Sequence, residues 1–386
     1  MKKRKIVAVT GIRSDYDLMT PVYNEIHNHP NMDLELIVTG AHLSDSYGCT
    51  VNEIEQDGFR IAERIESLIN GDRAASRVKG LAIQLQGMIQ TIERTKPDFL
   101  LVLGDREESI STALAGAYMN IPVAHVAGGD RVIGNVDDQV RHAVTKLSHL
   151  HFTTNDESAN RIAKLGEEKF RIINVGNPGL DRIKYVPILS RKELSEKLNF
   201  DIEEDEPLLL VIQHVISTEV EYAYEQMKVT MEAIKKMGYK TIISYPNSDA
   251  GGQQMIKAIH EYGDLPFIHV QKNIPRLEFI NIMREASCMV GNSSAGILEA
   301  PYLNLPVVNI GNRQKGRLHA ANVDFVEHCD EEIIRAVEKA LFNSEYRQEV
   351  INCLNPYGDG NAAKRIASIL ADIPIDKKLL IKEITY

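Results

Sequence analysis

Short apolar runs alternate with amphipathic stretches along most of the chain. The predicted strands of the first half are residues 6–10, 34–39, 60–65, 98–103 and 123–127. Helical patterns separate them at residues 18–27, 51–56, 74–95 and 109–119. The run at 98–103 lacks polar alternation, which is typical of a strand covered on both faces. This alternation of strands and helices predicts a parallel, doubly wound α/β sheet.

The alternation of strands and helices stops between about residues 175 and 198, where Gly176-Asn-Pro-Gly and Tyr185-Val-Pro predict a linker. It resumes with strands at residues 208–212, 241–244, 267–270, 288–290, 307–310 and 323–326, and helices at 219–237, 331–341 and 362–370. We therefore predict two Rossmann-like domains, residues 1–176 and 177–361, with residues 362–386 packing back on the first. In such sheets ligands bind at the carboxyl ends of the strands, so we expect a cleft between the domains.

Polar residues follow many of the predicted strands, where this fold class places its chemistry. In the first half they are Arg13, Asp15, His42, Asp105, Arg106 and Asp130. In the second half they are His214, Asn247, Asp249, Ser293, Ser294 and Arg313. Each could instead be a loop residue or a helix cap, and a buried, hydrogen-bonded histidine is the alternative for His42 and His214. Asp105 favours the functional interpretation because it follows the most apolar strand of the chain.

The stretch after residues 288–290 has the pattern of an anion site. Gly291-Asn-Ser-Ser opens a helical pattern, and backbone N–H groups at a helix start bind phosphate well. Asn292 or Ser293 could simply cap that helix. The following basic loop, which contains Arg313 and Arg317, favours a diphosphate. Glu299, about a turn further along, could accept hydrogen bonds from a ribose.

A second pattern lies after the Gly128-Gly129 loop. Asp137 and Arg141 are i, i+4 neighbours on a predicted helix and could pair on one face. One reading is an acidic helix start, which the helix dipole favours. The other is a carboxylate held in place by an arginine.

Composition narrows the class of protein. The chain of 386 residues is 44% hydrophobic and 25% charged, with a formal net charge of −10, which argues against a general nucleic-acid binder. The four cysteines include no CxxC pair, so we expect no metal site, no disulfide framework and a cytoplasmic location. No apolar run approaches the length of a membrane span, so we expect no membrane association.

Several enzyme classes lack their motifs. The loop after the first strand has one glycine where a dinucleotide fingerprint needs three, and no P-loop or Gly-x-Ser-x-Gly elbow occurs. No His/Asp/Glu cluster has the spacing of a catalytic metal site. The remaining pattern, a diphosphate site with carboxylates and a histidine, indicates a nucleotide-sugar enzyme.

The motifs resemble one family over nearly the whole chain. They include Gly11-Ile-Arg-Ser-Asp-Tyr, Leu103-Gly-Asp-Arg, His125-Val-Ala-Gly-Gly-Asp, Asp137-Asp-Gln-Val-Arg-His, Gln213-His, Pro246-Asn-Ser-Asp-Ala-Gly, Gly291-Asn-Ser-Ser and Gly311-Asn-Arg-Gln-Lys-Gly-Arg. The chain resembles the hydrolysing UDP-N-acetylglucosamine 2-epimerases of sialic acid biosynthesis and their relatives that act on diacetylbacillosamine for legionaminic acid. The resemblance implies a GT-B-like fold of two Rossmann-like domains facing a cleft.

The resemblance also implies a chemistry. UDP is eliminated across C1–C2 to give a 2-acetamidoglucal, and water then adds to release UDP and N-acetylmannosamine, with no cofactor. Position in the motifs carries over a catalytic set of Asp105, Asp137 and His214, with Arg141 orienting. The nucleotide-binding set is Arg13, Asp15, Arg106, Asn247, Asp249, Ser293, Ser294, Glu299 and Arg313. The family usually forms homodimers or homotetramers, and the predicted helix at residues 74–95 could supply an interface.

The chain departs from the family at two positions. Ala127 stands where many members have a glutamate, and we expect Asp130 to be a candidate for the missing carboxylate. Val215 stands where many members have proline after the histidine. UDP-N-acetylglucosamine is the leading substrate, and UDP- or GDP-linked diacetylbacillosamine is the alternative. A non-hydrolysing epimerase and an inactive nucleotide-sugar binding protein are further hypotheses.

Overall fold

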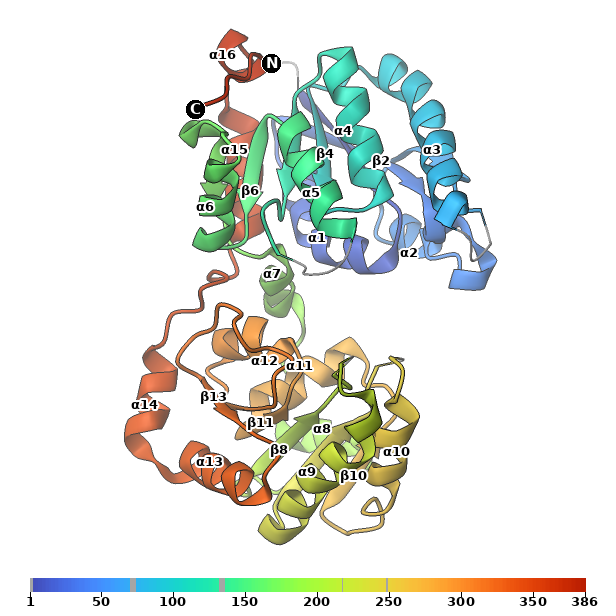
Figure 1. Ribbon diagram of the computed structural model, residues 1–386. Helices are drawn as coiled ribbons and strands as arrows, with labels where there is room; N and C mark the ends of the chain where they lie inside the picture. The colour runs from blue at the N-terminus through green and yellow to red at the C-terminus, as the bar shows by residue number, and fades with distance from the viewer. Residues whose placement is uncertain (1–2, 70–73, 132–135, 217, 248) are drawn as a thin grey trace. The chain divides into compact units, whose positions relative to one another are not determined.

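The computed structural model describes residues 3–69, 74–131, 136–216, 218–247 and 249–386. The chain forms two compact units, one made of Met1–Arg182 with Tyr357–Tyr386 and the other of Ile183–Pro356. Each unit contains a parallel β-sheet with helices between its strands (Figure 1). The predicted doubly wound α/β architecture is therefore confirmed for both units.

The sheet of the first unit has seven strands in the order β3-β2-β1-β4-β5-β6-β7. The strands are β1 (Arg4–Thr10), β2 (Met32–Thr39), β3 (Ile61–Ile65), β4 (Phe99–Leu103), β5 (Val123–Val126), β6 (Leu150–Thr153) and β7 (Ile172–Asn174). All neighbouring pairs are parallel. The chain order reverses between β1 and β4, and this reversal opens a crevice at the carboxyl ends of these two strands.

Helices connect these strands and cover the sheet (Figure 1). They are α1 (Arg13–His27), α2 (Val51–Gln56), α3 (Ala74–Thr95), α4 (Glu107–Met119), α5 (Val136–Leu147) and α6 (Asp156–Lys164), with 3₁₀ turns η1 (Gly40–Leu43), η2 (Asp45–Tyr47) and η3 (Lys169–Arg171). From the end of the chain, α15 (Ala362–Asp372) packs against α1, and α16 (Lys377–Leu380) follows it. Ile366 and Leu370 of α15 are fully buried in the same core as β1.

The sheet of the second unit has six parallel strands in the order β10-β9-β8-β11-β12-β13. They are β8 (Leu208–Ile212), β9 (Lys240–Ser244), β10 (Ile268–Gln271), β11 (Cys288–Gly291), β12 (Val307–Ile310) and β13 (Val323–Val326). The order reverses here between β8 and β11. The helices are α8 (Arg191–Leu198), α9 (Ala223–Met237), α10 (Gly252–His260), α11 (Arg276–Glu285), α12 (Ala295–Leu298), α13 (Asp330–Phe342) and α14 (Ser344–Asn352), with 3₁₀ turns η4 (Val220–Tyr222) and η5 (Ala300–Leu303).

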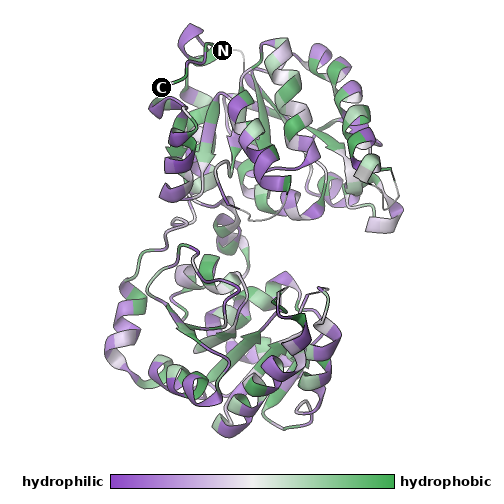
Figure 2. Ribbon diagram, in the orientation of Figure 1, coloured by the Kyte–Doolittle hydropathy of each residue, from purple (hydrophilic) through white to green (hydrophobic). Residues whose placement is uncertain are grey.

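The central strands are buried because helices cover them. All five residues of β8 and the first four of β4 are buried. Figure 2 shows the strands mainly in the colours of hydrophobic residues, with hydrophilic residues on the surrounding helices. Among the residues that the structure describes, none of the helices has the length and apolar composition needed to cross a bilayer.

The segment predicted as a linker, between about residues 175 and 198, contains two helices. The helix α7 (Pro178–Tyr185) begins at a proline, whose fixed φ suits the first turn of a helix. Ser190 then caps α8, accepting from the Glu193 backbone N–H while the Glu193 carboxylate accepts from the Ser190 N–H at 2.8 Å. The proline at the start of α7 and the Ser190 cap of α8 favour helices here, although the segment is rich in Gly and Pro. The division between the compact units falls inside α7.

A fully buried arginine fixes the end of the chain to the first unit. The Arg171 guanidinium donates to the carbonyl oxygens of Leu379 at 2.6 Å, Lys378 at 2.8 Å and Ile381 at 2.7 Å, and it pairs with Glu168 at 2.7 Å. The last carbonyls of a helix have no partner within the helix, so Arg171 satisfies the end of α16. A fully buried arginine such as Arg171 requires such partners, because burying an unpaired charge costs much free energy.

We predict that Arg171→Ala lowers the free energy of unfolding by about 3 kcal/mol or more, because buried carbonyls and Glu168 lose their donor. Chemical denaturation measures this change, and hydrogen exchange should show faster exchange in residues 377–386. Lys169→Ala is the matched control, since Lys169 is exposed in the same 3₁₀ turn, and its effect should stay within about 0.5 kcal/mol. Equal stability of the two variants would contradict the role of Arg171.

Candidate active site

The predicted site residues lie at the positions where strand order reverses. In the first unit Gly11 follows β1, and Asp105 follows β4 after Gly104. In the second unit His214 follows β8, and Asn292 follows β11. The two reversals are the usual ligand-binding positions of open α/β sheets.

In the first unit, Arg141 joins two of the predicted carboxylate residues. Its Nη2 pairs with the Asp105 carboxylate, and its Nη1 donates to the Asp130 carbonyl at 2.6 Å. Arg141 is 7% exposed, and burial lowers its pKa to about 10, so the guanidinium stays charged at neutral pH. The pairing of Arg141 with Asp137 stays a prediction, and the structure shows an ion pair of Arg141 with Asp105. A buried guanidinium needs a nearby carboxylate.

Asp137 lies in the first turn of α5, one turn before Arg141, and is partly buried. Its neighbour Asp138 lies in the same turn. Two carboxylates at the start of a helix are stabilised by the helix dipole. Asp137 lies on the same helix as Arg141, which is the ion-pair partner of Asp105.

Asp130 is held firmly beside the end of β5. Its Oδ1 accepts from the hydroxyls of Thr154 and Ser158, each at 2.7 Å. The loop reaches Asp130 through Ala127, whose φ of 59° is left-handed and unusual for a residue with a side chain. These two hydrogen bonds fix the orientation of the Asp130 carboxyl group in this loop.

The remaining predicted residues of the first unit lie near the end of β1. Arg13 is largely exposed and pairs with Glu53 at 3.3 Å. Asp15 lies 3.8 Å from Arg106, and burial raises the pKa of Asp15 to about 6, against the opposing charge of Arg106. His42 is fully buried between the hydroxyls of Thr10 at 3.0 Å and Thr50 at 2.7 Å. The alternative of a satisfied core histidine therefore describes His42.

In the second unit, His214 is positioned by Asn292. The His214 backbone N–H donates to Asn292 Oδ1 at 2.7 Å, and Asn292 Nδ2 donates to the His214 carbonyl at 2.9 Å. The Asn247 backbone N–H donates to His214 Nδ1 at 3.1 Å, so the neutral ring carries its proton on Nε2. Burial, reinforced by the charge of Arg313, lowers the pKa of His214 to about 4. His214 is therefore neutral at physiological pH.

The same asparagine connects His214 to the basic loop. Arg313 Nη1 donates to the Asn292 carbonyl at 3.1 Å, and Gln314 Nε2 donates to it at 2.9 Å. On the other side of His214, Asn247 Nδ2 donates to Asp249 Oδ2 at 2.7 Å, and both residues are exposed. The structure thus brings His214, Asn247, Asp249 and Arg313 together at one sheet edge.

Ser293 and Ser294 follow Asn292 and are partly exposed, but the helix after them is short. The helix α12 has four residues, and η5 continues it as a 3₁₀ turn. Pro301 limits the helix because its ring disfavours the α conformation of the preceding residue. The sequence-based argument from a helix dipole is therefore too strong, and the partly exposed hydroxyls and backbone N–H groups remain as candidate anion ligands.

Glu299 ends α12 and pairs with Arg276, whose Nη1 lies 2.8 Å from Glu299 Oε1. Arg276 was not among the predicted residues because it opens α11, which follows a different strand. The sequence suggested Asn292 as a possible helix cap. In the structure Asn292 is fully buried directly after Gly291, whose φ is 128°, and its side chain positions the backbone of His214.

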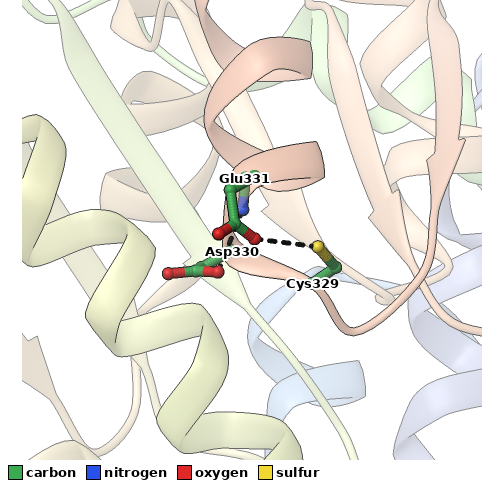
Figure 3. Close-up of side chains that lie close together, drawn as sticks. All are labelled: Cys329, Asp330 and Glu331. Carbon is green, nitrogen blue, oxygen red and sulfur yellow. Dashed lines mark hydrogen bonds between the residues drawn. The ribbon is translucent and has the colours of Figure 1, made fainter.

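Among the described residues, Cys329, Asp330 and Glu331 form a group whose ligand atoms lie within 4.8 Å of one another (Figure 3). These residues lie at the start of α13, where the dipole favours acidic groups. Asp330 pairs with Lys236, and the Cys329 thiol donates to Glu331 at 3.1 Å. These contacts account for the cluster as an acidic helix start.

Comparison with known proteins agrees with this arrangement. The UDP-N,N'-diacetylbacillosamine 2-epimerase (hydrolyzing) of Legionella pneumophila is 38% identical over 379 residues, which cover 98% of this chain and 98% of that protein. The GDP/UDP-N,N'-diacetylbacillosamine 2-epimerase (hydrolyzing) of Campylobacter jejuni is 33% identical over 352 residues, 90% of each chain.

A solved structure has the same fold. The UDP-GlcNAc 2-epimerase from Neisseria meningitidis bound to UDP-GlcNAc matches with a TM-score of 0.78 at 21% identity, over 95% of this chain and 99% of that chain. This likeness shows the GT-B-like two-domain fold. A family model described as UDP-N-acetylglucosamine 2-epimerase matches residues 24–371. The chain belongs to the UDP-N-acetylglucosamine 2-epimerase family.

Proposed function

We propose that the protein is a hydrolysing 2-epimerase that converts a UDP-linked N-acetylated hexosamine and water into the free 2-epimeric sugar and UDP. The observation that carries this proposal is the 38% identity, over 98% of both chains, with the hydrolysing enzyme of Legionella pneumophila. The name of that relative favours UDP-N,N'-diacetylbacillosamine as substrate. The UDP-N-acetylglucosamine 2-epimerase of Neisseria meningitidis serogroup B is 29% identical, so UDP-N-acetylglucosamine is the second candidate. This order reverses the sequence-based preference.

The first unit supplies the groups that remove a proton from C2 of the sugar. Proton transfer from carbon requires a carboxylate at a fixed position. We assign this task to the set Asp105, Asp137 and Asp130. The Arg141 guanidinium orients Asp105 directly, and its bond to the Asp130 carbonyl links the two loops. Arg141 is therefore a positioning residue.

The second unit supplies the groups that stabilise departing UDP. Negative charge grows on the diphosphate as the C1–O bond breaks, so nearby cations and N–H donors lower the barrier. We assign Arg313, Ser293 and Ser294 to the diphosphate. Asn247, Asp249 and Glu299 are assigned to the remainder of the nucleotide, and Arg13, Asp15 and Arg106 complete the binding set from the first unit. His214 Nε2–H can donate a hydrogen bond without adding charge.

The proposed enzyme acts in the cytoplasm, which suits four unpaired cysteines. We further propose a homodimer or homotetramer, which light scattering measures.

The reaction itself is tested by incubating the protein with UDP-N,N'-diacetylbacillosamine and, separately, with UDP-N-acetylglucosamine. Proton and phosphorus NMR should show free UDP and a free 2-epimeric sugar from the first compound. A product that retains its nucleotide would indicate a non-hydrolysing epimerase. Binding without turnover of either compound would indicate a binding protein.

We predict that Asp105→Asn retains UDP binding and loses about 10²–10⁴-fold in kcat, because the carboxylate that acts on C2 is gone. Calorimetry measures UDP affinity, and release of UDP measures turnover. The control is Asp264→Asn, at an exposed position away from the strand ends, which should leave both quantities unchanged. Turnover by Asp105→Asn near the wild-type rate contradicts the assignment.

The low pKa of His214 gives a second prediction. Its folded-state pKa of about 4 lies below the ordinary value of 6.5, so the ring should stay neutral as the pH falls from 8 to 5.5. The imidazole resonance that disappears in His214→Asn should therefore keep its chemical shift over this range in NMR spectra. A titration of that resonance with a midpoint near 6.5 would show that burial does not hold the ring neutral.

A further inference from the structure

A cavity of about 280 Å³ opens at the carboxyl edge of the first sheet. Its walls come from the segments after β1, β2, β3 and β4 and from α3. The lining residues that matter here are Ile12, Leu68, Leu81, Arg77, Arg106, Glu107 and Glu108. Arg106 directly follows Asp105, and both lie at the carboxyl end of β4. The cavity therefore lies at the same edge of the sheet as the carboxylate proposed to act on C2.

Glu108 is a buried polar group that lines the cavity. The residue is 8% exposed, and its Oε2 accepts no hydrogen bond from the described residues, although Arg106 Nε lies 3.5 Å away. A carboxyl with one unsatisfied buried oxygen is costly, so a ligand that bonds to it gains that energy back. Burial raises the pKa of Glu108 above its ordinary value, and the nearby charge of Arg106 opposes this shift.

The absence of a side chain at Gly11 leaves room for the Glu108 carboxyl group. A Cβ at Gly11 would lie 1.7 Å from Glu108 Oε1, so no side chain fits there while Glu108 keeps its position. Gly40 contributes to the same notch, because its Cβ would approach Glu108 Oε1 to 3.0 Å. The carboxyl is therefore packed under the ends of β1 and β2.

The charges of the cavity are matched, which argues against an anionic ligand group. Arg77 pairs with Glu107. Arg106 lies 3.8 Å from Asp15, 3.9 Å from Glu107 and 3.5 Å from Glu108. Each of these arginines therefore already lies beside a carboxylate of the cavity. The cavity is thus suited to a neutral group that forms hydrogen bonds.

The cavity lining also includes apolar side chains, among them Ile12, Leu68 and Leu81. A hydroxyl group could bond to Glu108 but would leave these side chains without a partner. An acylamino group carries an N–H for Glu108 and a methyl for the leucines, and burial of that methyl is favourable.

We propose that this cavity receives the second acetylamino group of a diacetylated amino sugar, with Glu108 Oε2 accepting a hydrogen bond from its amide N–H and Leu81 packing on its methyl. This inference rests on the proposed function and names the residues that select its substrate. The first acetylamino group stays at C2, beside Asp105. Glu108 is thereby a specificity-determining residue.

The contact is tested by saturation-transfer NMR with UDP-N,N'-diacetylbacillosamine bound to the full-length protein. We expect both acetyl methyls to be saturated in the wild type. In Leu81→Phe, which fills the cavity, the second methyl should lose its signal relative to the first. Val78→Phe on the exposed face of α3 is the matched control and should behave as the wild type. Absence of binding, or a second methyl that is unsaturated in the wild type, overturns the inference.

The hydrogen bond of Glu108 is tested by kinetics on both sugar nucleotides. In Glu108→Leu the ratio of kcat/KM for the diacetylated substrate to that for UDP-N-acetylglucosamine should fall about tenfold, whereas Glu108→Gln, which keeps a side-chain oxygen as acceptor, should restore most of the ratio. An equal loss on both substrates would show a purely structural residue. A wild type that turns over neither compound refutes the proposed function, and the methyl signals, which need binding alone, then still decide the inference.

Discussion

The reversal of strand order in each sheet is the constraint on which the site depends. In the first sheet β1 and β4 are neighbours, although the chain forms β2 and β3 between them, and β8 and β11 are related in the same way in the second. The connections leave such a pair in opposite directions, so no helix start covers the edge between them. Asp105 and His214 both follow strands of these pairs. Parallel pairing thus brings together chemical groups that are far apart in the sequence.

Strand ends alone would not fix the side chains, and each unit uses one buried polar residue for this purpose. Arg141 connects Asp105 with the loop that carries Asp130. Asn292 connects the backbone of His214 with Arg313. Both residues are more than nine-tenths buried, and a buried polar group adopts the geometry that satisfies its hydrogen bonds. The groups that we propose as catalytic are therefore positioned by residues that need not touch the substrate.

Much of this could be predicted from the sequence, because apolar runs and the polar residues after them are local signals. The strands β4 and β8 are short and uniformly apolar, and they were predicted to within about a residue. The strand β6 was missed because His151 interrupts its pattern, and that residue is buried through its bond to Glu167 at 3.1 Å. The partner of Arg141 was missed because Asp105 is 36 residues away in the chain. Nothing in the local sequence indicates that Glu108 is buried in the folded chain.

The proposed diphosphate site at the edge formed by β8 and β11 is tested most directly by a crystal structure of the protein with UDP. The diphosphate is predicted to lie within hydrogen-bond distance of the hydroxyls of Ser293 and Ser294, with the Arg313 guanidinium facing its oxygens. A nucleotide bound away from these residues would contradict this assignment of the two sheet edges, whatever sugar the enzyme accepts.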